Sequence, residues 1–155
     1  MPDGKTSDRV DGMSVAFAEA RAAGARGEVP VGAAILCEGA IVACAGNLTL
    51  GGNDPTAHAE ILAIRAAAAA LGSQRLSGCD LYVTLEPCAM CAGAISFARI
   101  RRLYYAAADE KGGAVEHGPR FFDQPTCHHR PLVSRAGDAE GAGQMLKEFF
   151  RARRT

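Results

Sequence analysis

Two short motifs supply the side chains of a metal-dependent hydrolytic site. His58 and Glu60 form an H-x-E motif, and a P-C-x-x-C motif at residues 87–91 follows after a gap of 26 residues. One imidazole and two thiolates suit zinc, and catalytic zinc sites keep three protein ligands and leave the fourth position for water. We therefore predict that His58, Cys88 and Cys91 bind Zn2+, and that Glu60 acts beside the bound water as a general acid and base.

The spacing of these residues predicts that each motif opens a helix. Cys88 and Cys91 stand three residues apart, so they would share one helix face, and the proline before them is favoured at a helix start. Near a helix N-terminus the dipole stabilises thiolates. His58 begins a second helical segment after the turn-like residues 51–56, where it can reach the metal while Glu60 points toward the water. Taken alone, H-A-E is more typical of a surface helix start, and C-x-x-C is common.

Alternating helix and strand patterns place the two motifs in an α/β domain. We expect the chain to begin with a helix capped by Asp8 or Asp11, followed by two apolar strands around a hairpin turn at Glu38-Gly39. The H-A-E helix, a strand, the C-x-x-C helix and another strand should come next. A long loop from Asp109 to about Pro125, a weak strand near 131–135 and a helix over about 138–153 should then complete the order. This order predicts one three-layer α/β/α domain over residues 1–155, with about the first seven residues disordered. Both metal-bearing helix starts should then meet at one edge of the sheet.

The bulk properties fit a globular enzyme. The chain has 155 residues, 48% hydrophobic and 22% charged, which suits one domain with a real core. No apolar run reaches membrane-spanning length and residues 1–10 lack the apolar segment of a signal peptide, so we predict no membrane partner and a cytoplasmic location.

The cysteines outside the metal motif have simpler interpretations. Six cysteines invite a disulfide framework, but such frameworks are typical of small secreted proteins. Cys37 and Cys44 lie in apolar strand segments and are interpreted as buried hydrophobic residues. Cys79 lies beside a turn and has no evident role. We expect a reducing compartment.

Positive charge gathers at the C-terminal end. The net charge is zero, but residues 1–96 hold 6 Lys and Arg against 10 Asp and Glu, whereas residues 97–155 hold 11 against 7. Basic groups neutralise phosphates and aromatic rings stack on unpaired bases. This pattern predicts RNA binding by Phe149, Phe150, Arg151, Arg153 and Arg154. The alternative is a terminal helix that the two phenylalanines anchor and whose arginines form a solvated face.

The two metal motifs in this order are the signature of the zinc nucleobase deaminases. The runs EVPVGAAI, DPTAHAEI, LYVTLEPCAMCAGAI and FFRARR resemble those of the bacterial tRNA-specific adenosine deaminases, over about residues 13–154. This resemblance implies a cytidine-deaminase-like fold with a central five-stranded mixed sheet. It also implies hydrolytic conversion of adenosine to inosine at the wobble position of a tRNA anticodon stem-loop, by a homodimer.

Two further residues gain a role from this resemblance. Asn47 suits a strand end by turn chemistry alone, but its position matches a family asparagine whose amide binds the flipped base. Asp109 is either an ordinary loop acid or, as in the family, a group near the sugar of the target, where it could bind a 2′-hydroxyl and select RNA over DNA. The segment 112–131, with Cys127-His128-His129, departs from the family pattern.

Two other functions remain open on the sequence alone. The same zinc site would serve a deaminase of a free base or nucleoside such as cytosine or guanine, which needs no RNA surface. A non-catalytic zinc or RNA-binding module would instead close the coordination sphere with a fourth ligand such as Cys127 or His128.

Overall fold

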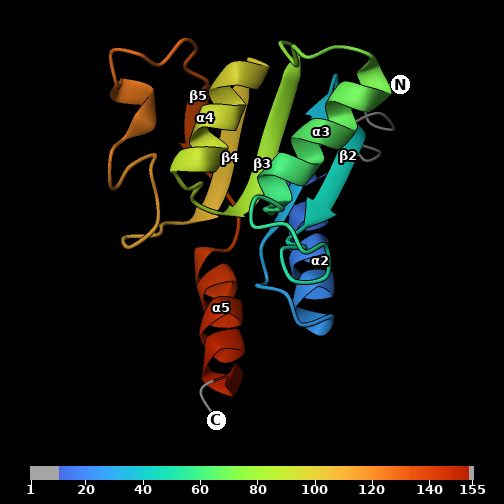
Figure 1. Cartoon of the computed structure of the whole chain (residues 1–155), viewed down its shortest axis with the longest axis vertical. Coiled ribbons are helices and arrows are strands. Elements are labelled where there is room, and N and C mark those ends of the chain that lie inside the picture. The colour runs from blue at the N-terminus through green and yellow to red at the C-terminus, as the bar shows by residue number, and fades with distance from the viewer. Residues whose placement is uncertain (1–10, 154–155) are drawn as a thin grey trace, which may run out of the picture.

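A five-stranded mixed sheet forms the middle of the molecule in this computed structural model, which describes residues 11–153 (Figure 1). The strands lie in the order β2-β1-β3-β4-β5. β1 pairs antiparallel with β2 and β3, whereas β3–β4 and β4–β5 are parallel. The predicted fold class is confirmed. The strands are β1 (Gly32–Cys37), β2 (Ala40–Gly46), β3 (Cys79–Leu85), β4 (Arg102–Ala107) and β5 (Leu132–Arg135).

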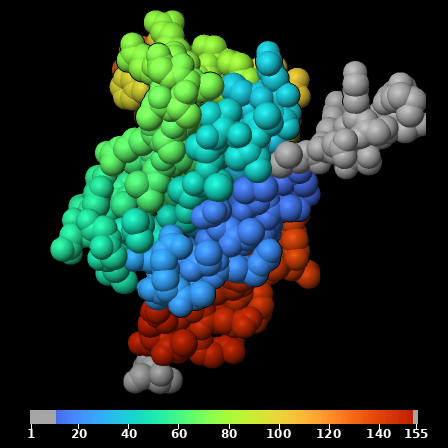
Figure 2. Space-filling view, turned by 90° about the vertical axis from the view of Figure 1, so that its right-hand side faces the viewer, coloured from blue at the N-terminus to red at the C-terminus, as the bar shows by residue number. Residues whose placement is uncertain are grey.

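Helices cover both faces of the sheet. α3 (Ala59–Leu71) and α4 (Ala89–Ala98) pack on one face over the larger core, while α2 (Gly12–Ala25) and the start of α5 (Ala139–Arg153) pack on the other. The N-terminal ends of α3 and α4 lie at the end of the sheet where α5 begins (Figure 1). Seen from the side, α5 lies directly against the part of the surface that α2 and the residues after it form (Figure 2).

The side chain of Asp11 begins α2. Its Oδ1 accepts a hydrogen bond from the backbone N–H of Met13 at 3.1 Å, so one free donor of the first turn is satisfied. α2 then packs closely on β1, because a Cβ atom on Gly32 would come within 2.5 Å of the Ala20 nitrogen. Asp8, the other predicted cap, and the seven residues expected to be disordered lie outside the described residues.

The hairpin turn at Glu38-Gly39 agrees with the prediction. Both residues have positive φ, at 53° and 81°, which matches the twist of a tight two-residue connection between antiparallel strands.

The interpretation of Cys37 and Cys44 as buried hydrophobic residues was wrong, and Cys79 has a role that the sequence did not reveal. Cys37 and Cys79 lie opposite each other in the β1–β3 register and form a disulfide. Cys44 is exposed on β2, and its thiol donates a hydrogen bond to Glu19 Oε2 at 3.3 Å. Strand pairing brings together residues 42 positions apart, which no local pattern reveals. Within residues 11–153, no helix is long and apolar enough to cross a membrane.

Candidate metal centre

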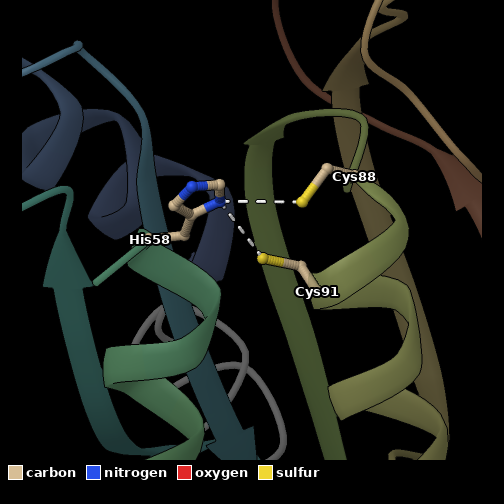
Figure 3. Close-up of side chains that lie close together, drawn as sticks. All are labelled: His58, Cys88 and Cys91. Atoms are coloured by element: carbon tan, nitrogen blue, oxygen red, sulfur yellow. Dashed lines mark hydrogen bonds between the residues drawn. The ribbon is translucent and has the colours of Figure 1, made fainter. Parts of the chain in front are cut away.

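His58, Cys88 and Cys91 face one another between the first turns of α3 and α4 (Figure 3). The Nδ1 atom of His58 lies 3.6 Å from Cys88 Sγ and 3.5 Å from Cys91 Sγ, and the three atoms are all within 4.8 Å of one another. Zn–S and Zn–N bonds of about 2.3 and 2.1 Å in a tetrahedron place such ligands about 3.5 Å apart. The three side chains therefore fit one zinc ion. No other His, Cys, Asp or Glu of residues 11–153 joins this cluster.

Helix starts hold the three ligands, as the spacing predicts. His58 is the N-cap of α3, Cys88 is the N-cap of α4, and Cys91 lies in the first turn of α4. Pro87 stands one residue before the cap rather than inside the helix, and its carbonyl accepts a hydrogen bond from Ala114 at 2.9 Å. Each ligand is thus fixed by the end of a regular element.

The thiols of Cys88 and Cys91 have pKa values shifted in opposite directions. Hydrogen bonds from Cys91 and then His58 lower the pKa of Cys88 to about 4, although burial opposes this shift. The hydrogen bond to Cys88 raises the pKa of Cys91, and burial and the nearby Glu60 raise it further. The hydrogen bond with Cys88 also raises the pKa of His58. Binding of a metal would therefore release protons from this cluster.

The Glu60 carboxyl group has a pKa that suits proton transfer at neutral pH. It is 4% exposed, and burial raises its pKa to about 7. General acids and bases work best when their pKa lies near the operating pH. The group therefore suits both accepting and donating a proton at neutral pH.

A cleft of about 570 Å³ opens beside the ligands and brings several of the predicted site residues together. This volume lies in the usual range for small-molecule sites. The cleft is lined by His58, Glu60 and Cys88, by Asn47 and Asp109, by Glu86, by the apolar residues Val29, Val31, Leu85, Leu146 and Phe150, and by residues 108–112.

Asn47 links the cleft to α3. Its Oδ1 accepts a hydrogen bond from the Ala59 N–H at 2.8 Å, which satisfies a donor that the N-cap His58 leaves free. The Nδ2 of Asn47 is the polar atom of this side chain that remains for a ligand.

Asp109 lies where β4 leads into the cleft wall. Its Oδ1 accepts hydrogen bonds from the N–H groups of Lys111 at 3.2 Å and Gly112 at 3.0 Å. Its own N–H donates to Glu86 Oε1 at 2.9 Å. Asp109 is therefore a structured turn residue as well as a lining residue.

Glu86 is a cleft residue that the sequence reasoning missed. It is 2% exposed. Burial raises the pKa of its carboxyl, but hydrogen bonds from Asp109, His117 and Val115 outweigh burial and lower it. The sequence feature that could have revealed Glu86 is an acidic residue at the end of an apolar strand, directly before the metal motif.

The terminal helix α5 places one phenylalanine and one arginine on each of two faces. Phe150 lines the cleft and is 46% exposed. Phe149 faces α2, and the Arg153 guanidinium lies 3.7 Å from the centre of its ring and donates to the Gly27 carbonyl at 3.3 Å. Arg151 lines a second hollow beside the cleft. The RNA-binding prediction for these residues is untested, and Arg154 lies outside the described residues.

The Cys127-His128-His129 segment has other contacts. Cys127 Sγ lies 3.5 Å from Ser96 Oγ, and His129 Nε2 lies 2.7 Å from the Ile100 carbonyl. The His128 ring tilts against Phe97. These contacts fasten the segment to the C-terminal end of α4, away from the metal cluster.

Known proteins resemble this chain in sequence and in fold. The profile of the cytidine and deoxycytidylate deaminase zinc-binding region matches residues 6–107. The tRNA-specific adenosine deaminase of Agrobacterium fabrum (strain C58) is 59% identical over 149 residues, which are 96% of this chain and 97% of that protein.

Two solved structures share the fold. A chain from studies of A-to-I editing by tRNA:A34 deaminases at the wobble position of transfer RNA has a TM-score of 0.79 and 64% identity, and the match covers 80% of this chain and 95% of that one. The guanine deaminase from Nitrosomonas europaea has a TM-score of 0.75 and 26% identity, with 88% and 81% covered.

Proposed function

The chain belongs to the zinc-dependent cytidine and deoxycytidylate deaminase family, and from this we propose that it converts adenosine to inosine at the wobble position of a tRNA anticodon loop. The relative from Agrobacterium fabrum and the solved tRNA:A34 deaminase support this substrate. The cofactor is Zn2+, for which His58, Cys88 and Cys91 supply the donor set.

The observation that favours RNA over a free base is a basic hollow that continues from the cleft. This hollow, of about 500 Å³, shares Asp109, Lys111 and Phe150 with the cleft and adds Lys147 and Arg151. Cationic groups beside a base-sized cleft suit the phosphates of the nucleotides that flank a flipped base. A free base carries no phosphate for them to contact.

Glu60 carries out the proton transfers of the reaction. When bound, zinc lowers the pKa of a coordinated water to near 7. Glu60 accepts one proton of the attacking water and delivers it to the ring nitrogen of adenine. It then carries the remaining hydroxyl proton to the C6 amino group as the C–N bond breaks, so that water and adenosine give inosine and ammonia. Its pKa of about 7 supports both directions of transfer. The Asn47 amide holds the base in the cleft.

Asp109 makes the protein prefer RNA to DNA by contacting the sugar of the target nucleotide. Its Oδ1 already accepts two backbone N–H groups, so Oδ2 remains to accept a hydrogen bond from a ribose 2′-hydroxyl. DNA has no such group. RNA therefore gains a contact that DNA lacks.

The remaining assignments concern assembly and location. We propose a single deaminase domain over residues 1–155 that works as a cytoplasmic homodimer, with Phe149, Phe150, Arg151, Arg153 and Arg154 as the RNA-binding group. Exposed apolar side chains on α4, Phe97 at 72% and Met90 at 37%, support an association surface. Light scattering on wild type and on Phe97→Asp tests it, and a wild-type monomer would contradict the dimer.

One experiment separates the substrates. Zinc-loaded protein is incubated with an anticodon stem-loop that carries adenosine at the wobble position, with free adenosine and with guanine, and the products are identified by mass spectrometry. We expect inosine from the stem-loop alone. The fold shared with guanine deaminase makes guanine the second candidate, and turnover of guanine with no product from the stem-loop would establish that function instead.

A further inference from the structure

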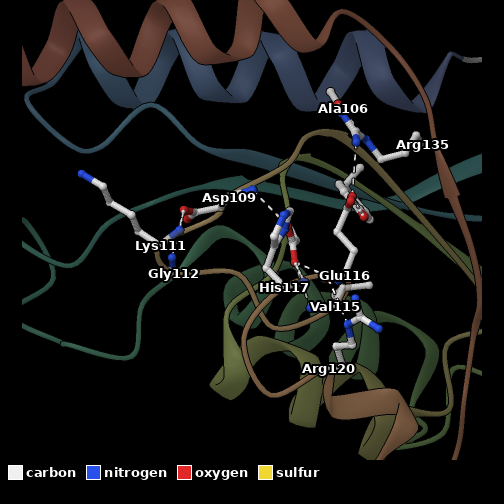
Figure 4. Close-up of polar contacts among 11 residues, drawn as sticks. Ala106, Asp109, Lys111, Gly112, Val115, Glu116, His117, Arg120 and Arg135 are labelled. Carbon is white, nitrogen blue, oxygen red and sulfur yellow. Dashed lines mark hydrogen bonds and ion pairs between the residues drawn. The ribbon is translucent and has the colours of Figure 1, made fainter.

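Residues 109–117 form a loop without regular secondary structure whose first four residues line the cleft, and we call this loop the wall. They follow β4 directly, and residues 108–112 line the cleft. A segment of this kind has no helix or strand bonds of its own, so its backbone donors need other partners. Several of these donors converge on one carboxylate, that of Glu86. Figure 4 labels the residues that supply them, Asp109, Val115, Glu116 and His117.

Glu86 holds this wall at both ends. Its Oε1 accepts from the Asp109 N–H at 2.9 Å and contacts His117 Nδ1 at 2.8 Å. Its Oε2 accepts from the N–H groups of Val115, Glu116 and His117 at 3.0, 2.9 and 3.1 Å. The side chain is fully buried. Five donors therefore saturate the two oxygens, which leaves Glu86 no role as a metal ligand despite the nearby carboxylate of Glu116.

The packing around Glu86 leaves no freedom for the wall to shift toward it. A Cβ atom on Gly113 would collide with the Glu86 carboxyl group and come within 2.5 Å of the Asp109 carbonyl oxygen. Gly113 also donates its N–H to that carbonyl at 2.9 Å. The glycine thus lets the chain fold tightly over the carboxylate.

A second anchor fixes only the far end of the wall. The Glu116 carboxylate accepts from the Tyr105 hydroxyl and from Arg135 Nη1, and Arg135 also donates to the Ala106 carbonyl at 2.7 Å (Figure 4). These contacts tie Glu116 to β4 and β5. Glu86 alone among these acids binds the backbone of Asp109.

We propose that Glu86 is a positioning residue that fixes the backbone of residues 109–117 and thereby sets where Asp109 and the cleft wall meet the RNA substrate. This rests on the proposed function for its kinetic part. Glutamine has nearly the same shape but would turn an amide N–H toward backbone N–H donors at one of the two oxygen positions. Glu86→Gln therefore removes one of the two acceptor oxygens and the negative charge with little change in volume.

Glu28 offers a matched control in the same molecule. It is also a buried glutamate, 3% exposed, and its two oxygens accept from the N–H groups of Leu50 at 3.1 Å and Gly51 at 2.7 Å. It holds a different loop, which precedes α3. Glu28→Gln therefore makes the same chemical change away from residues 109–117.

Hydrogen exchange followed by mass spectrometry tests the structural part on zinc-loaded protein without substrate. In Glu86→Gln we expect amide exchange in 109–117 to become about tenfold faster or more, with exchange in 48–54 unchanged. In Glu28→Gln we expect faster amide exchange in 48–54 and unchanged exchange in 109–117. Unchanged exchange in 109–117 of folded, zinc-loaded Glu86→Gln would overturn the proposal. If that variant does not fold, Gly113→Ala displaces the wall from the other side and carries the same expectation.

A double-mutant cycle with Asp109→Asn tests the functional part. If Glu86 acts through Asp109 and the wall, Glu86→Gln should lower kcat/KM for the stem-loop about tenfold, mainly through KM. In the Asp109→Asn background it should have much less effect, whereas the effect of Glu28→Gln should be the same in both backgrounds. Equal losses for Glu86→Gln in both backgrounds would overturn this role. If wild type forms no inosine, the proposed substrate fails, while the exchange experiment still decides whether Glu86 holds the wall.

Discussion

The metal corner, formed by His58, Cys88 and Cys91, and the wall, formed by residues 109–117, are built in different ways. The ligands of the corner stand at or just after the caps of two helices that pack on a sheet. The wall is a loop that a few polar contacts hold in place. The corner is therefore positioned by the core, and the wall by individual side chains.

This difference has a chemical consequence. Metal ligands must stay within a few tenths of an ångström of their positions, which rigid element ends provide. Recognition of a flexible RNA loop tolerates a wall that depends on a few hydrogen bonds. We therefore expect changes in the corner to abolish the reaction, and changes in the wall to alter which substrate is used and how tightly it binds.

Replacing Cys88 with alanine should have the largest effect. Two remaining ligands hold zinc poorly, so Cys88→Ala should lose both the metal and all measurable inosine formation. Zinc content by atomic absorption and product by mass spectrometry measure this. Cys44→Ala is the control, because Cys44 is exposed. Activity without bound zinc would contradict the assignment of the corner.

Replacing Glu60 separates the proton transfer from the metal. Glu60→Gln should keep zinc and the fold but lower kcat by about 10²–10⁴-fold, which is the usual contribution of a general acid or base. Single-turnover assays with the stem-loop measure the loss. Turnover near the wild-type rate would rule out this role for Glu60.

Asp109→Asn, a substitution in the wall, should change the selectivity for RNA over DNA rather than the chemical step. Loss of a charged acceptor for the 2′-hydroxyl should lower the RNA-to-DNA ratio of kcat/KM by about tenfold. Matched RNA and DNA hairpins measure this ratio, with zinc content as the control. An unchanged ratio would remove sugar recognition by this carboxylate.

Arg151 and Arg153 are exposed residues of one helix that should behave differently. Arg151→Ala should weaken stem-loop binding and reduce the slope of log affinity against log salt by about 0.7, the value for one phosphate contact on a single strand. Arg153→Ala should in addition lower Tm by about 2–4 °C through loss of its contacts with Phe149 and Gly27. Binding titrations at several salt concentrations and thermal melts measure both. Identical profiles would contradict the separation of the two faces.

The smallest effect should be a pH dependence of stability from His117. The hydrogen bond with Glu86 raises the pKa of His117, and the charges of Glu86, Glu116 and Glu110 add to this. Because the folded pKa lies above the unfolded one, the stabilisation is complete below the ordinary histidine pKa and is lost as pH rises through the folded value. Urea midpoints of wild type and His117→Gln should therefore differ more at pH 6 than at pH 9. A constant difference would contradict the ion pair.

Local sequence patterns predicted much of this molecule correctly. The alternation of strands and helices predicted the three layers, and the C-x-x-C spacing predicted that Cys88 and Cys91 share a helix start, because these features depend on residues close together in the chain. The pairing of Cys37 with Cys79 was missed because strand register between segments 42 residues apart decides it. The role of Glu86 in holding residues 109–117 was missed for the same reason.

The sequence by itself determined the donor set, its order and the kind of chemistry, since ligand type and helix spacing are local properties. The tertiary structure alone decided that Asn47 binds the start of α3, that Phe150 lines the cleft while Phe149 contacts α2, and that Glu86 gathers five donors. Those outcomes depend on how separate elements pack and on which donors burial leaves unsatisfied. Both are properties of the folded chain as a whole.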